Sequence, residues 1–119
     1  MMALLLVGSV TLDAQAQQAA VQTAETQEEI SPERALELLQ AGNERFVNGD
    51  MMQRDYMEQV EQTATGQYPF AVVLSCIDSR VPPELVFDQG VGDIFTARVA
   101  GNFVNTDILG SMEFATAVA

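Results

Sequence analysis

The chain has 119 residues, 48% of them hydrophobic, which is enough for one small domain. Its 17 acidic residues oppose five arginines, with no lysine or histidine, and the formal net charge is −12 at pH 7. This charge repels phosphate backbones and anionic lipid head groups, so we expect no nucleic-acid partner and no membrane partner for the mature protein. The single cysteine excludes a disulfide within the chain.

The N-terminus predicts an exported protein. Residues 3–10 are apolar but too few to span a bilayer, and Ala14-Gln15-Ala16 offers the small-x-small pattern that signal peptidase reads. We predict a signal peptide over residues 1–16 and a periplasmic location, although no basic residue precedes the apolar run. A disordered apolar tail is the alternative. The next segment is rich in Gln, Ala, Thr and Glu, which predicts a disordered linker over residues 17–30.

Two helices are predicted after the linker. Ser31 is a suitable N-cap and Pro32 suits a first helical turn, so a helix is expected from about 32 to 47, with Gly49 as its stop. Residues 50–65 carry Met and Tyr side chains at helical spacing, which predicts a second, weaker helix. We interpret the apolar side chains of both helices as packing surfaces.

The pattern then changes to that of a buried strand. Residues 70–75 are uninterruptedly apolar and rich in Val, which predicts a strand buried on both faces of a parallel sheet. Pro82 and Pro83 mark a turn, and residues 84–87 predict a single helical turn.

A second strand is predicted over residues 94–99, followed by a helix from Asn105 or Thr106 to the end of the chain. Strands that alternate with helices indicate an α/β fold. We therefore predict a mostly parallel central sheet flanked by helices, with a helical arm at the N-terminus.

The candidate site follows the first predicted strand, where residues 76–80 read Cys-Ile-Asp-Ser-Arg. Ligand sites of α/β sheets lie at the carboxyl ends of parallel strands, and a neighbouring arginine favours the thiolate form of Cys76. Cysteine protease and tyrosine phosphatase chemistry are disfavoured, because the chain lacks histidine and Pro82 stands where a phosphatase loop needs arginine.

Zinc binding suits these residues better. Cys76 and Asp78 are both zinc ligands by chemistry, and Arg80 can hold the Asp78 carboxylate in a bidentate pair. Two ligands do not hold zinc, since catalytic sites use three protein ligands and an open position. The simpler alternative is a buried structural cysteine beside an ordinary ion pair.

A multi-part signature continues from this motif. Val-Pro-Pro-Glu follows Cys-x-Asp-Ser-Arg directly, and Phe-Asp-Gln-Gly-x-Gly-Asp and Arg-Val-Ala-Gly-Asn come after it. With these motifs residues 68–114 resemble the β-class carbonic anhydrases. Gly-Asn-Glu-Arg-Phe at residues 42–46 is similar to the N-terminal arm of that family, so the resemblance extends over residues 31–119.

The resemblance implies zinc-dependent, reversible hydration of carbon dioxide to bicarbonate. It makes Cys76 a zinc ligand and Asp78 with Arg80 a catalytic dyad. In an open state the dyad orients zinc-bound hydroxide, and in a closed state Asp78 itself becomes the fourth zinc ligand. Gln67 matches the position of an amide that binds the substrate. A homodimer or tetramer of the full-length protein is implied as well.

The sequence also departs from the family. The other two zinc ligands of that family belong to a Gly-His-x-x-Cys segment, which is absent from these 119 residues. The resemblance therefore implies a partial domain over residues 31–119, inactive and poorly folded alone, whose function belongs to a full-length parent. Two alternatives stay open: a hydrolase of the same fold, acting on a molecule such as carbon disulfide, and an inactive interaction module that docks on a full-length subunit.

Overall fold

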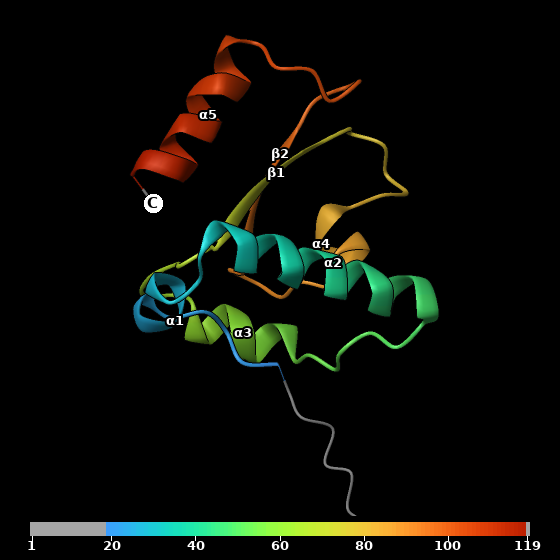
Figure 1. Ribbon diagram of the computed structural model, residues 1–119, viewed down its shortest axis with the longest axis vertical. Coiled ribbons are helices and arrows are strands. Elements are labelled where there is room, and N and C mark those ends of the chain that lie inside the picture. Colours follow the sequence, from blue (N-terminus) through green and yellow to red (C-terminus); the bar gives the residue numbers. More distant parts are fainter. Residues whose placement is uncertain (1–18, 119) are drawn as a thin grey trace, which may run out of the picture.

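The computed structural model describes residues 19–118, which form an α/β fold as predicted (Figure 1). The elements follow one another along the chain as α1 (Ala24–Glu28), α2 (Pro32–Asn48), α3 (Tyr56–Gln62), β1 (Ala71–Ser75), α4 (Pro83–Val86), β2 (Ile94–Arg98) and α5 (Thr106–Ala117). The predicted signal peptide over residues 1–16 lies outside the described residues, and nothing in the structure tests the predicted periplasmic location.

Local capping sets the ends of α2, as the sequence predicts. The Ser31 hydroxyl accepts a hydrogen bond from the main-chain N–H of Arg34 at 3.2 Å, and Pro32 occupies the first turn. Gly49 ends the helix in the left-handed conformation with φ 76°. Helix α3 is shorter than the predicted 50–65, because the Asp55 carboxylate caps the main-chain N–H groups of the next turn and starts the helix there.

Helix α1 lies inside residues 17–30, which the sequence predicts to be a disordered linker, so the structure differs from that prediction. Thr23 and Thr26 form a reciprocal capping box. The side-chain amide of Gln27 donates to the carbonyl oxygen of Pro69 at 2.7 Å, which attaches the helix to the entry of β1. Polar contacts thus give order to a segment with little apolar surface.

The two strands are parallel neighbours, with a register that runs from the Ala71–Ile94 pair to the Ser75–Arg98 pair. Helix α5 contacts both strands, and Figure 1 shows α1, α2 and α3 gathered at the other end of the molecule. Because the strands are parallel, their carboxyl ends lie at the same edge of the sheet. The loops that leave β1 and β2 therefore meet there.

The burial of β1 differs from the prediction. The strand was predicted to be buried on both faces, but each of its five residues is partly exposed. The described residues pair β1 with β2 alone and place α5 against the strands, so both the free edge and part of the faces meet solvent. Among residues 19–118 no hydrophobic residue forms a buried core, whereas four polar residues are buried: Gln59, Asp88, Gln89 and Asp93. No helix of this described part is long and apolar enough to cross a membrane.

Candidate functional site

The motif Cys-Ile-Asp-Ser-Arg forms the loop that leaves the carboxyl end of β1, where the sequence predicts it. Ser75, the last residue of β1, pairs with Arg98, the last residue of β2, and the main-chain N–H of Val99 donates to the Ser75 carbonyl oxygen at 3.1 Å. The register thus brings residues 98–102 against the motif loop.

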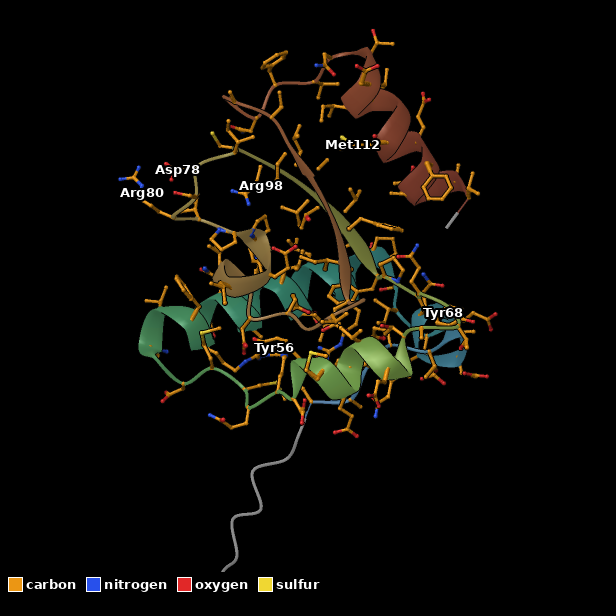
Figure 2. All side chains as sticks on the ribbon, turned by 180° about the vertical axis from the view of Figure 1, so that it is seen from behind. Tyr56, Tyr68, Asp78, Arg80, Arg98 and Met112 are labelled. Atoms are coloured by element: carbon orange, nitrogen blue, oxygen red, sulfur yellow. The ribbon has the colours of Figure 1, made fainter. Side chains whose placement is uncertain are left out.

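Asp78 and Arg80 form a bidentate ion pair at this loop. The Arg80 guanidinium donates from Nε to Asp78 Oδ1 at 2.9 Å and from Nη2 to Oδ2 at 2.7 Å. The main-chain N–H of Arg80 adds a third hydrogen bond to Oδ1 at 3.0 Å. Figure 2 shows the two side chains together at the end of the strands. The sequence-based expectation of a paired carboxylate is confirmed, while its catalytic role remains a prediction.

The pair has an electrostatic consequence for Asp78. Hydrogen bonds from the Arg80 side chain and main-chain N–H lower the pKa of Asp78 to about 2, and the charge of Arg98 acts in the same direction. The same pair raises the pKa of Arg80. Asp78 is therefore an ionised hydrogen-bond acceptor at neutral pH.

Cys76 is a free, partly exposed thiol. The main-chain N–H of Gly101 donates to its Sγ at 3.4 Å. That hydrogen bond, followed by one from the main-chain N–H of Asp78, lowers the pKa of Cys76, although the Asp78 charge opposes the shift. These hydrogen bonds favour the thiolate, the form that attacks electrophiles and binds metals, over the neutral thiol.

Arg98 is a site residue that the sequence reasoning missed. Its Nε donates to the carbonyl oxygen of Cys76 at 2.9 Å, and its Nη2 donates to the carbonyl oxygen of Asp78 at 2.7 Å. Figure 2 shows Arg98 next to Asp78. The signal was present in the Arg-Val-Ala-Gly-Asn run at residues 98–102: it ends a strand parallel to β1, so it had to lie at the same sheet edge.

Gln67 lies away from these residues. It precedes β1, whereas Cys76 follows it, and a strand of five residues spans about 17 Å. Figure 2 shows Tyr68, the neighbour of Gln67 in sequence, far from Asp78. Within one chain the predicted substrate-binding amide is thus not brought to the loop.

The metal ligands found here are fewer than zinc requires. No group of three or more His, Cys, Asp or Glu side chains converges anywhere in residues 19–118. Cys76 suits zinc as a thiolate ligand, but both Asp78 oxygens are engaged by Arg80. Because a catalytic zinc site uses three protein ligands, these side chains supply a part of such a site only.

Comparison with known proteins identifies the sequence around the site. The sequence model of the family described as carbonic anhydrase matches residues 71–119. Carbonic anhydrase 2 of Mycobacterium tuberculosis is 43% identical over 89 residues, and β carbonic anhydrase 1 of Caenorhabditis elegans is 36% identical over 53 residues. Residues 71–119 thus match the carbonic anhydrase family, and one of these relatives is named a β carbonic anhydrase. The matched segment contains the whole loop with Arg98 and Gly101, while Gln67 precedes it.

The chain spans less than half of the length of these relatives. The alignment covers 74% of this chain and 43% of the M. tuberculosis protein, and 44% of this chain and 20% of the C. elegans protein. The solved structure of the β-carbonic anhydrase CcaA is 32% identical, with a TM-score of 0.48 over 71% of this chain and 41% of that one.

Proposed function

We propose that this chain serves the reversible hydration of carbon dioxide to bicarbonate, with Cys76 as one ligand of a zinc ion and Asp78 with Arg80 as the catalytic pair. One observation carries the proposal. An ionised carboxylate, held by two guanidinium hydrogen bonds, stands two residues from a thiol with a lowered pKa, within the segment that matches the carbonic anhydrase family.

Each residue has a distinct role in the proposal. A zinc ion held in part by Cys76 would supply an acidified water molecule as the nucleophile for carbon dioxide near pH 7. Ionised Asp78 accepts a hydrogen bond from the attacking nucleophile, and this contact aims the nucleophile at the substrate carbon. Arg80 fixes both carboxylate oxygens and excludes other orientations of Asp78. Arg98 and Gly101 position the loop by holding the main chain and sulfur of Cys76.

The ligand count gives the second part of the proposal. The chain has one cysteine and no histidine, and two candidate ligands do not complete a zinc site. We therefore propose that the 119-residue polypeptide alone neither holds catalytic zinc nor hydrates carbon dioxide. In that case the activity belongs to a protein that adds the missing ligands.

The test begins with the coding DNA beyond the codon for Ala119, read for an in-frame Gly-His-x-x-Cys. The protein of the complete reading frame and the 119-residue polypeptide are then compared for zinc content and for carbon dioxide hydration by stopped flow. We expect about one zinc per chain and rapid hydration in the first protein only, with loss of about 10²-fold or more in Asp78→Asn. Asp107→Asn, in the exposed first turn of α5, is the control.

Two results would overturn the proposal, each a different part of it. Zinc at one per chain with hydration by the 119-residue polypeptide would refute the ligand shortfall. A zinc-loaded protein from the complete frame that leaves carbon dioxide unreacted would refute the activity. Carbon disulfide is included as a second substrate, because a hydrolase of the same fold would act on it instead.

A further inference from the structure

A buried cluster of charges lies outside the candidate site, around Asp88. The Asp88 side chain is completely buried, and its carboxylate accepts from Arg45 Nε at 2.5 Å and from Arg54 Nη1. The main-chain N–H of Met52 donates to the same carboxylate at 3.2 Å. A buried charge is costly unless it is paired and hydrogen-bonded, and here two cations and an N–H meet that demand.

The cluster also holds the main chain of Asp88. The carbonyl oxygen of Asp88 accepts from Arg54 Nη2 at 2.6 Å, and the Arg54 side chain is 3% exposed. Asp88 has φ 47°, in the left-handed region that residues other than glycine rarely adopt. The side chain and the backbone of Asp88, the second residue after the end of α4, are thus fixed together.

Helix α2 fits closely against the same end of α4. The Asn43 side-chain amide donates to the carbonyl oxygen of Val86 at 2.9 Å. At Gly42 a Cβ atom would lie 1.8 Å from the carbonyl oxygen of Phe87, so only glycine permits this approach. With the Arg45–Asp88 pair, three nearby positions of α2 contact three successive residues, namely the last residue of α4 and the two that follow it.

Residues 87–93, whose first two residues these contacts fix, join the two elements that shape the candidate site. Helix α4 begins at Pro83, shortly after Arg80, and β2 carries Arg98 at its end. The Thr96 hydroxyl of β2 also donates to Glu84 Oε1 of α4 at 3.0 Å. A shift of this segment would therefore move the loop of Cys76 and Asp78 relative to the arginine that holds it.

We propose that Asp88 is a positioning residue for the candidate site: with Arg45 and Arg54 it fixes α4 and β2 so that Arg98 meets the carbonyl oxygens of Cys76 and Asp78. The inference rests on the proposed function in that the loop is taken as the catalytic one. The competing account is that the cluster stabilises the whole fold equally and has no specific effect on the site.

Trypsin separates these two accounts, because the five arginines are the only tryptic residues among the 119. Cleavage after Arg98 requires its guanidinium to leave the two carbonyl oxygens, whereas Arg34 lies on α2 with a side chain 57% exposed. The protein of the complete reading frame is digested under native conditions, with Arg45→Met and Arg45→Lys as variants. Glu37→Gln, which breaks an exposed ion pair on the same helix, is the matched control.

We expect Arg45→Met to accelerate cleavage after Arg98 about tenfold while cleavage after Arg34 stays within about twofold of the wild-type rate. Arg45→Lys, which retains the charge, and Glu37→Gln should both cleave after Arg98 at nearly the wild-type rate. Equal acceleration at Arg34 and Arg98 in Arg45→Met would show a global effect and overturn the proposal. Unchanged cleavage after Arg98 would overturn it too.

A kinetic readout links the inference to catalysis. In the zinc-loaded protein, Arg45→Met is expected to lower kcat for carbon dioxide hydration about tenfold or more, with KM and zinc content nearly unchanged. A rise in KM alone would contradict a positioning role. The proteolysis result does not depend on activity. If the wild-type protein does not hydrate carbon dioxide, the proposed function is refuted, and the rate of tryptic cleavage after Arg98 still tests the inference about the cluster.

Discussion

The main-chain N–H of Gly101 lies 3.4 Å from the sulfur of Cys76 and donates to it, although 25 residues separate the two in sequence. Gly101 has φ 79°, and no atom lies within 4 Å of the place where its Cβ would stand. The glycine is thus required by backbone conformation and not by lack of space.

We predict that Gly101→Ala raises the pKa of Cys76 toward its ordinary value, because a strained backbone turns the N–H away from the thiolate. Below that pKa the variant has less thiolate, so alkylation by iodoacetamide at pH 7.5 should slow about twofold to fivefold. The 119-residue polypeptide has one cysteine, so the pH profile of its alkylation reports this thiol alone. Gly110→Ala, in α5 with open space around it, should leave the profile unchanged.

A second prediction concerns the ion pair of Asp78. Arg80→Met should raise the pKa of Asp78 from about 2 toward 3.8, measured by carboxyl ¹³C NMR titration. Because the folded-state pKa is depressed, the pair stabilises the wild type above the unfolded-state pKa, and this stabilisation is lost as pH falls toward 2. The variant should lack that pH dependence. Arg34→Met leaves Asp78 untouched and serves as control; a pKa still near 2 in Arg80→Met would assign the shift to other groups.

The close approach of α2 to α4 gives a third prediction. Gly42→Ala places a Cβ 1.8 Å from the Phe87 carbonyl oxygen, so the helices must separate. We expect a loss of about 1–3 kcal/mol in the free energy of unfolding by urea denaturation. Gly110→Ala should instead gain up to about 1 kcal/mol, because alanine favours an open helical position. Equal effects of the two substitutions would contradict the contact.

Asp93 supplies a fourth prediction. Burial raises the pKa of Asp93 and outweighs the hydrogen bond from the Gly90 N–H and the charge of Arg54, which both lower it. Among the described residues its Oδ1 has no hydrogen-bond partner, while Oδ2 accepts from Gly90 at 2.6 Å. The folded-state pKa of Asp93 exceeds its unfolded-state value of 3.8. The contribution of Asp93 to the free energy of unfolding is therefore most favourable below pH 3.8, and it falls as the pH rises through the folded-state pKa.

Asp93→Asn should remove this fall and leave the protein at pH 7 equal to the wild type or more stable by about 1 kcal/mol, measured by urea denaturation between pH 4 and pH 7. Asp88→Asn is the contrasting variant. Burial would raise the pKa of Asp88, but hydrogen bonds from Arg45, Arg54 and Met52 outweigh it and lower the pKa. That substitution should therefore cost about 3–5 kcal/mol at pH 7. A greater loss from Asp93→Asn than from Asp88→Asn would refute these assignments.

Apart from α1 and the bounds of α3, the sequence by itself determined the elements and the nearest pairings of this protein. Ser31 and Gly49 set the two ends of α2, because their hydrogen bonds and backbone angles involve residues within one helical turn. Asp78 and Arg80 pair because they stand two residues apart in one turn of the loop. The signature around them was sufficient to predict the match of residues 71–119 to the carbonic anhydrase family.

Only the tertiary structure decided which distant groups hold that loop and how far β1 is buried. Arg98 reaches Cys76 and Asp78 across 22 and 20 residues through the register of two parallel strands. Arg45 and Arg54 converge on Asp88 from 43 and 34 residues away. Such contacts depend on how whole elements pack, and neither hydrophobic spacing nor capping chemistry encodes that packing, since both are set by neighbours in sequence.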